Sequence, residues 1–203
     1  MGNYPKFGGR ELSDKVAILV QRVRAMEDEL EEEFNRRRNQ FNYRLERGRA
    51  VFEQDVRRHH EAMKQSLSSY LSDARPLVVL TAPVIYAMII PFVLLDVFIT
   101  IYQAVCFPIY RIEKVKRRNF ITFDRKHLSY LNGLEKLNCM YCSYGNGLLA
   151  YAVEIAGRTE KHWCPIKHAK RMEGRHAHYH EFVEFGDAEG FQRTKKALHD
   201  ATK

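Results

Sequence analysis

The stretch from Pro76 to Tyr110, PLVVLTAPVIYAMIIPFVLLDVFITIYQAVCFPIY, is almost entirely apolar and determines how this 203-residue chain is organised. A helix needs about 20 apolar residues to cross a bilayer, so the run is longer than one span but too short for two. Pro83, Pro91 and Pro108 interrupt it. The run (residues 76–110) therefore predicts either one long, tilted, proline-kinked membrane helix or a hairpin that turns near Pro91.

Basic residues flank this run on both sides, and the whole chain has a net charge of +8. A single span with a cytoplasmic C-terminus would require transfer of the charged N-terminal third across the membrane, and we expect no signal peptide there. A hairpin keeps both basic flanks on the cytoplasmic side, as Lys and Arg statistically prefer. The flanking charge therefore favours the hairpin, with the single kinked helix as the alternative.

Asp96 is the only formal charge inside the apolar run, which contains no Lys, Arg or His. A lone carboxylate at the bilayer centre is costly, so an intramembrane acid invites a functional interpretation as a proton or ion relay. We expect instead that Asp96 lies near the turn or the interface, wet or protonated. A polar contact between subunits is the alternative.

Residues 13–75 contain no Pro and a single Gly, and they predict one long amphipathic helix. Apolar residues recur there every 11 residues, in two sets that lie four residues apart and share a face. The sets are Leu19, Leu30, Phe41, Phe52 and Met63, and Val23, Phe34, Leu45, Val56 and Leu67. We expect a coiled coil that forms a homo-oligomer or binds a partner in a membrane complex, with contact to lipid as the alternative. Residues 1–12 are expected to be a flexible N-terminus.

Two pairs of potential metal ligands follow the apolar run. Cys139 and Cys142 form a Cys-x2-Cys pair, and Cys164 and His168 form a Cys-x3-His pair after 21 intervening residues. Three thiolates and one imidazole suit tetrahedral zinc, and iron can use similar ligands. We expect Pro165 to open a helix that Cys164 caps. A disulfide or redox pair, or inert thiols, remain alternatives to a metal site.

The sequence around these ligands predicts short helices over 124–138 and 148–159, with a turn at 143–147. Residues 111–170 would thus form a small α-rich module with the metal site, whose ligands His162 could support from outside. Residues 171–203 form a His-rich tail, in which His176, His178 and His180 suggest a second metal site, a pH-sensitive surface or a solvated surface. Asp187 is predicted to cap a helix over 188–202.

The segment with YLN, NCMYC and WCPIKHA resembles a group of uncharacterised bacterial membrane proteins with the pattern YLN…NCxYC…WCPIKHA. The resemblance covers about a quarter of the chain. It implies a bacterial source and a membrane location, and it supplies no mechanism. With the flanking charge, we expect the inner (cytoplasmic) membrane, with the C-terminal module on the cytoplasmic side.

The sequence as a whole predicts a mainly α protein. With 45% hydrophobic and 29% charged residues the chain is too apolar for a disordered protein, and four Cys exclude a disulfide-dense scaffold. Phosphate-binding glycine loops and hydrolase or metalloprotease motifs are absent from it. We expect a non-enzymatic, membrane-anchored scaffold or accessory subunit with a structural zinc site. An iron-containing electron-transfer subunit is the alternative, and nucleic acid is not expected as a partner.

Overall fold

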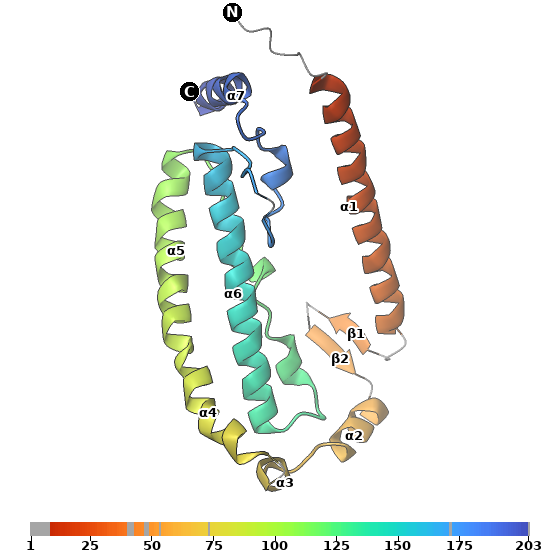
Figure 1. The fold of residues 1–203 in the computed structure, drawn as a ribbon. Coiled ribbons are helices and arrows are strands. Elements are labelled where there is room, and N and C mark those ends of the chain that lie inside the picture. Colours follow the sequence, from red (N-terminus) through yellow and green to blue (C-terminus); the bar gives the residue numbers. More distant parts are fainter. Residues whose placement is uncertain are drawn as a thin grey trace, which may run out of the picture. The chain divides into compact units, whose positions relative to one another are not determined.

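The architecture comes from a computed structural model that describes residues 9–39, 43–46, 49–52, 54–72, 74–170 and 172–202. The chain is mainly helical, as predicted (Figure 1). It divides into two compact units, Met1–Ala62 and Met63–Lys203. The expected flexible N-terminus lies outside the described residues up to position 8, and a helix begins at Gly9.

The first unit shows that the prediction of one helix over 13–75 is wrong. It contains α1 (Gly9–Asn39), β1 (Tyr43–Glu46), β2 (Arg49–Phe52) and α2 (Gln54–Ala62). The two strands are antiparallel, with Tyr43 opposite Phe52 and Glu46 opposite Arg49. Aromatic and β-branched residues favour strands over helices, and Gly48 lowers the helix propensity of this stretch.

An exposed apolar stripe runs along α1. Its members are Val16, Leu19, Val23, Met26 and Leu30, which are 39–66% exposed. They follow one another at alternating steps of three and four residues, a spacing typical of a coiled-coil seam. The 11-residue recurrence cannot continue as one helix, because β1 and β2 follow α1.

The second unit is built around two long helices. Its elements are α3 (Leu67–Ser72), α4 (Pro76–Ala87), α5 (Ile89–Ile109), η1 (Arg117–Asn119), η2 (Asp124–His127), α6 (Gly133–Trp163), η3 (Tyr179–Glu181) and α7 (Ala188–Thr202). Helices α5 and α6 lie side by side and run in the same direction (Figure 1). The connecting segment 110–132 must therefore return along both helices. Asp187 caps α7 as predicted, since its Oδ1 accepts a hydrogen bond of 2.8 Å from the Gly190 amide.

Residues 76–109 form one long helix with a single interruption at Met88. Pro91 explains the interruption, because it cannot donate to the carbonyl of Ala87, where α4 ends. Helix α5 continues through Pro91 without a reversal, so the hairpin prediction is wrong. The helix is long and apolar enough to cross a membrane, and none of its most apolar stretch is buried.

Helix α6 is continuous where two short helices and a turn were predicted. It begins with Asn132, whose side chain accepts from the Glu135 amide while the Glu135 carboxylate accepts from the Asn132 amide. It then continues through Gly145 and Gly147. A Cβ on Gly147 would lie 2.5 Å from the Phe120 carbonyl oxygen, and one on Gly145 would lie 2.9 Å from the Phe92 ring. These glycines therefore allow close packing rather than a turn.

The core lies where α5, α6 and segment 110–132 meet. Its buried members are Phe107, Val115, Ile121, Leu148, Tyr151 and Ile155. Each of the three segments contributes, so the returning segment is an integral part of this core. Burial of each of the larger apolar side chains contributes about 1.5–3 kcal/mol to the stability of the folded state.

Candidate functional site

Asp96 lies in a cluster with Arg117 and Tyr144, here called the Asp96 cluster. The Arg117 guanidinium donates to both carboxylate oxygens, with Nε–Oδ1 3.0 Å and Nη2–Oδ2 2.6 Å. The Tyr144 hydroxyl donates to Oδ2 at 2.9 Å. The hydrogen bond with Asp96 raises the pKa of Arg117, so the guanidinium stays charged. The cluster thus joins α5, the returning segment and α6 through one carboxylate.

This cluster gives Asp96 a cationic partner in the same chain, which the expectation of a wet or protonated carboxyl did not include. The alternative of a polar contact between subunits stays a prediction. The cation comes from position 117, which lies outside the apolar run itself. A signal existed, since seven Lys and Arg residues lie within segment 110–132, but the sequence does not show which one returns to Asp96. Because both oxygens accept from fixed donors, the carboxylate acts as a structural link.

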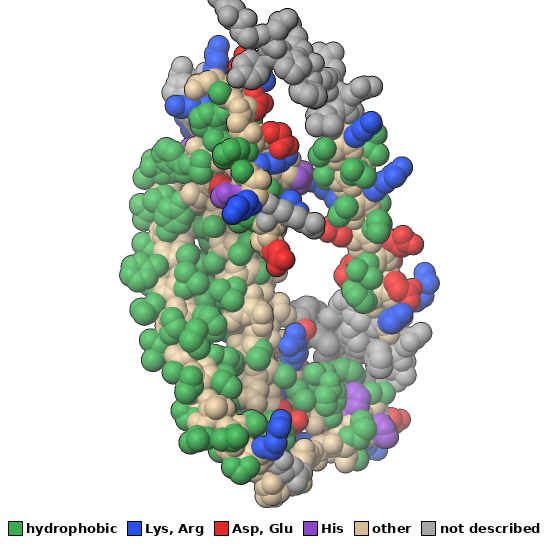
Figure 2. All heavy atoms as spheres, in the orientation of Figure 1, with side chains coloured by type: hydrophobic (Ala, Val, Ile, Leu, Met, Phe, Trp, Pro, Cys, Tyr) green, Lys and Arg blue, Asp and Glu red, His purple; other side chains and the backbone are tan. Residues whose placement is uncertain are grey.

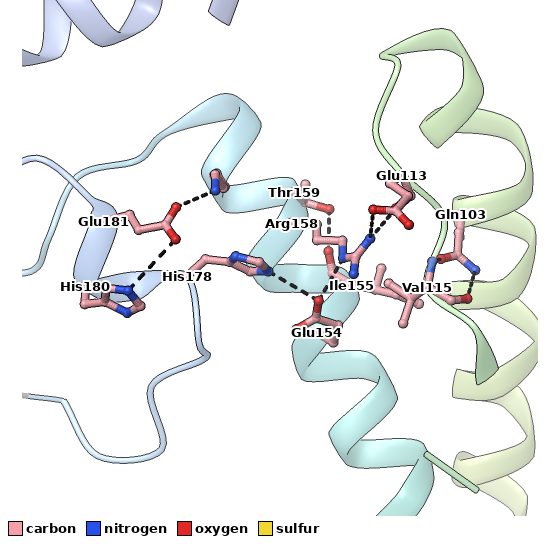
Figure 3. A network of polar contacts seen from close by, with 11 residues as sticks. Gln103, Glu113, Val115, Glu154, Ile155, Arg158, Thr159, His178, His180 and Glu181 are labelled. Carbon is pink, nitrogen blue, oxygen red and sulfur yellow. Dashed lines mark hydrogen bonds and ion pairs between the residues drawn. The ribbon is translucent and has the colours of Figure 1, made fainter. Parts of the chain in front are cut away.

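A second polar link lies about two helical turns further along α5. The side chain of Gln103 is buried and donates from Nε2 to the Tyr151 hydroxyl at 2.8 Å and to the Val115 carbonyl at 3.3 Å. Its Oε1 accepts from the Val115 amide (Figure 3). The side-chain amide of Gln103 therefore forms hydrogen bonds with both backbone polar groups of Val115, which lies outside any helix or strand. Buried backbone N–H and C=O groups need such partners.

Further along α6, Glu154 accepts from Arg158 Nε at 2.8 Å and lies 3.2 Å from His178 Nε2 (Figure 3). Burial alone raises the pKa of Glu154, but the hydrogen bonds from Arg158 and His178 outweigh it, and the pKa is lowered. Arg158 also donates to the Glu113 carbonyl at 2.8 Å. This network ties both the returning segment and the C-terminal region to α6.

The histidines of the tail have separate partners. His176 Nε2 lies 2.9 Å from Glu160 Oε2, and its ring lies against Gly157 of α6. His180 lies 3.9 Å from a Glu181 oxygen in η3. His176 and His178 therefore both face α6, and each contacts a different carboxylate. The structure does not gather them into the second metal site that the alternation suggested.

The four predicted metal ligands are not brought together. Cys139 and Cys142 lie within α6 and Cys164 lies at its C-terminal end, about 33 Å along the axis from Cys142. His168 lies beyond it, where its backbone N–H donates to the Tyr179 hydroxyl at 2.7 Å. One ion cannot bind ligands so far apart, so this fold does not form the predicted four-ligand site. Among the described residues, no three His, Cys, Asp or Glu side chains are placed to hold a metal.

The surroundings of Cys164 also differ from the prediction. No helix opens at Pro165, and Cys164 instead ends α6. The neighbouring rings of His162 and Trp163 lie against Tyr110, with centroids 5.6 and 5.0 Å apart respectively. His162 therefore helps pack the end of α6 against the end of α5, and it does not support a set of metal ligands.

An apolar groove of about 500 Å³ lies between α5 and α6. Its lining includes Ile99, Tyr102, Ala152, Ile155, Trp163 and Cys164. The Tyr102 hydroxyl and Thr159 Oγ1, 2.9 Å apart, form a hydrogen bond within the groove. Most of the lining is apolar, and its acidic member, Glu160, lies 2.9 Å from His176 Nε2.

Searches against models of protein families, curated proteins and solved structures give no match to this chain. The resemblance to bacterial membrane proteins therefore stays a prediction. The candidate site rests on the geometry of the second unit alone.

Proposed function

We propose that the protein is a membrane-anchored scaffold or accessory subunit, in which α4 and α5 attach a small folded module to a lipid bilayer. The observation that carries this proposal is the division of α5 into two faces. One face holds Asp96, Gln103 and Phe107, which contact the rest of the unit. The other face is apolar and exposed, which is unusual for a protein surface in water.

The first unit supplies a surface for protein contact. The stripe on α1 is apolar and exposed, and a helix with such a stripe gains stability when a second helix covers it. We propose that α1 pairs with another copy of this chain or with a partner in a membrane complex. Replacing Val23 by Asp would then shift the detergent-solubilised protein to a smaller assembly in sedimentation velocity, whereas an unchanged sedimentation coefficient would contradict this pairing.

The location follows from charge and from the family resemblance. Lys and Arg outnumber Asp and Glu by 33 to 25, and anionic lipids of a cytoplasmic leaflet attract such surfaces. We propose the cytoplasmic side of a bacterial inner membrane for the C-terminal module. Because α6 separates the cysteine pairs, neither zinc nor iron enters the proposed function.

Flotation of the full-length protein with lipid vesicles tests the proposal. Membrane attachment predicts that the purified chain, diluted out of detergent, rises with vesicles through a density gradient. The proposal would be contradicted if the protein stayed at the bottom of the gradient as a folded, monodisperse species with every vesicle composition tested. Co-purification in mild detergent would then identify the partner of the scaffold.

A further inference from the structure

We infer that α5 lies in the plane of the membrane surface, with its exposed face in one leaflet of an anionic bilayer, rather than crossing it. This inference deepens the proposed function and rests on it. It commits to one occupant of the exposed apolar face, which is the outer part of a single lipid leaflet. Four features of the second unit support it, namely helix direction, charge placement, the outer stripe and the basic returning segment.

The first feature is the direction of α5 and α6. Contacts between them advance together along both helices, from Tyr86 with Asn138, through Gln103 with Tyr151, to Tyr110 with Trp163. Two parallel neighbours need a connection that runs back over their length. Segment 110–132 is that connection, and its Val115 and Arg117 bind successive positions of α5 on the way.

The second feature is what this connection carries. Segment 110–132 has an irregular backbone apart from two short 3-10 turns, and it holds seven Lys and Arg and two Asp and Glu. Irregular backbone and charged side chains are costly in the hydrocarbon region of a bilayer. If α5 crossed the membrane, this segment would have to cross it as well, exposing Lys116 and Arg118 at the level of Asp96.

The charged residues of the helix pair leave no uncharged stretch as long as the hydrocarbon core of a bilayer is thick. On α6, Lys136 lies two residues before Asn138 and Glu154 lies three residues after Tyr151, so these two charged residues are about 27 Å apart along the axis. Arg117 is bound between these levels, beside Tyr144. A hydrocarbon core is about 30 Å thick, so a crossing helix would place at least one of these charged groups inside it.

The third feature is the outer face of α5. Its exposed members are Ile90, Val93, Leu94, Val97, Phe98, Ile101, Val105 and Ile109, which are 46–69% exposed. Residues 90, 93, 97, 101, 105 and 109 follow one another at steps of three and four, and Leu94 and Phe98 lie next to them, so the set occupies one side of the helix. Figure 2 shows hydrophobic side chains covering α4 and α5 in a continuous band with few charges among them. Such a stripe can enter a leaflet while the opposite face stays in water.

The fourth feature selects lipid over a second copy of the chain as the occupant. The returning segment is basic and exposes Lys114, Lys116, Arg118, Arg125 and Lys126 beside the helix pair. Because the chain has a net charge of +8, two copies repel one another, whereas anionic headgroups attract basic residues at about 1 kcal/mol for each residue near the surface. A helix lying in a leaflet brings these side chains to headgroup level.

Depth measurements along the helix test the inference. Single cysteines at Ile90, Leu94 and Ile109, which are 63%, 54% and 69% exposed, would carry a fluorescent label in a chain whose natural cysteines are Ser. Quenchers placed at known depths in vesicles of phosphatidylcholine with about 30% phosphatidylglycerol would report each position. Phe185, which is 68% exposed and lies outside the helix, gives the matched control in water.

The in-plane arrangement predicts one shallow depth for all three labels, within about 5 Å. A crossing helix would spread the three depths, because Ile109 lies about 22 Å from Leu94 along the axis, and that result would overturn the inference. Absence of any vesicle binding would instead overturn the proposed function. Polarised infrared spectra of the unmodified protein give an independent readout. The parallel α5 and α6 should both lie flat, and helices along the bilayer normal would contradict the inference.

Discussion

Arg117 reaches back to the middle of the apolar helix and binds both carboxylate oxygens of Asp96, with distances of 3.0 and 2.6 Å. The Asp96 side chain is 15% exposed and that of Arg117 is 44% exposed, so the pair lies at the edge of the unit. It connects a segment with a strongly basic composition to a helix that carries one charge. The pair thereby fixes which face of α5 packs against the protein and which remains free.

Breaking this pair should loosen the returning segment. We expect Asp96→Asn and Arg117→Gln each to lower the free energy of unfolding by about 1–2 kcal/mol, after allowance for the half-exposed guanidinium. The double variant should lose less than the sum of the two, because the partners interact. Thermal unfolding in detergent measures this. Arg118→Gln, at an exposed neighbouring position, is the control, and equal losses for positions 117 and 118 would contradict the assigned pairing.

Gly147 should be the least tolerant glycine of α6. An added Cβ would lie 2.5 Å from the Phe120 carbonyl oxygen and 3.0 Å from Ile121 Cα, both backbone atoms. We expect Gly147→Ala to destabilise the second unit by about 1–3 kcal/mol through overpacking.

Gly133 provides the matched comparison in the same helix, since nothing lies within 4 Å of the position that a Cβ would take there. Gly133→Ala should leave the melting temperature unchanged or raise it slightly, because Ala has the higher helix propensity. Equal tolerance at positions 133 and 147 would show that segment 110–132 does not pack on α6 as described.

Glu154 should make the C-terminal region sensitive to acid. Its pKa is lowered below the ordinary value of 4.5, so its contribution to stability is present above pH about 4.5. That contribution is lost as the pH falls through the lowered pKa and the carboxylate is protonated in the folded state. We expect Glu154→Gln to cost about 1 kcal/mol at neutral pH and to flatten the loss of stability as the pH falls below about 4.5.

Melting temperatures measured across this pH range would show the difference between the wild type and the variant. Glu189→Gln serves as the control, because the Glu189 side chain is 91% exposed. If the gap between wild type and Glu154→Gln stays constant down to the acid unfolding of the wild type, the ion pairs with Arg158 and His178 do not supply the stability.

The thiols provide a test of the metal hypothesis. Cys142 and Cys164 are exposed and lie at different levels of α6. We therefore expect Cys142→Ser and Cys164→Ser to change the free energy of unfolding by less than about 0.5 kcal/mol, as surface substitutions do. Chelators should have no effect on the melting temperature. A cooperative loss of structure in either variant, together with loss of bound zinc or iron, would contradict the separated placement.

Sequence patterns predicted those features that depend on local chemistry. The apolar run, the mainly helical content and the Asp187 cap of α7 follow from composition and capping preferences. Gly145 and Gly147 look like turn residues, but their role depends on Phe92 and Phe120, which lie far away in sequence. The partner of Asp96 was likewise out of reach, because only the return of the chain along α5 selects Arg117 from its basic neighbours.

The cysteine pairs also show that a local sequence pattern does not determine which residues come together in the fold. Their spacing is compatible with a metal site only if the intervening residues fold back. The absence of Pro from 133–163 and the capping signal at Asn132 and Glu135 allow one unbroken helix instead. Ligand spacing alone therefore could not decide between a compact site and thiols held apart.

Vesicle binding by two phenylalanine variants tests the central claim most directly. Phe98 lies on the outer face of α5 and Phe185 lies outside the helix, and both side chains are 68% exposed. Phe98→Asp should lower partitioning of the full-length protein into anionic vesicles by about tenfold or more, because the variant loses the free energy of burying the Phe98 ring in lipid. Phe185→Asp should leave partitioning unchanged. Equal partitioning of Phe98→Asp and the wild type would contradict the claim that this face holds the protein on the membrane.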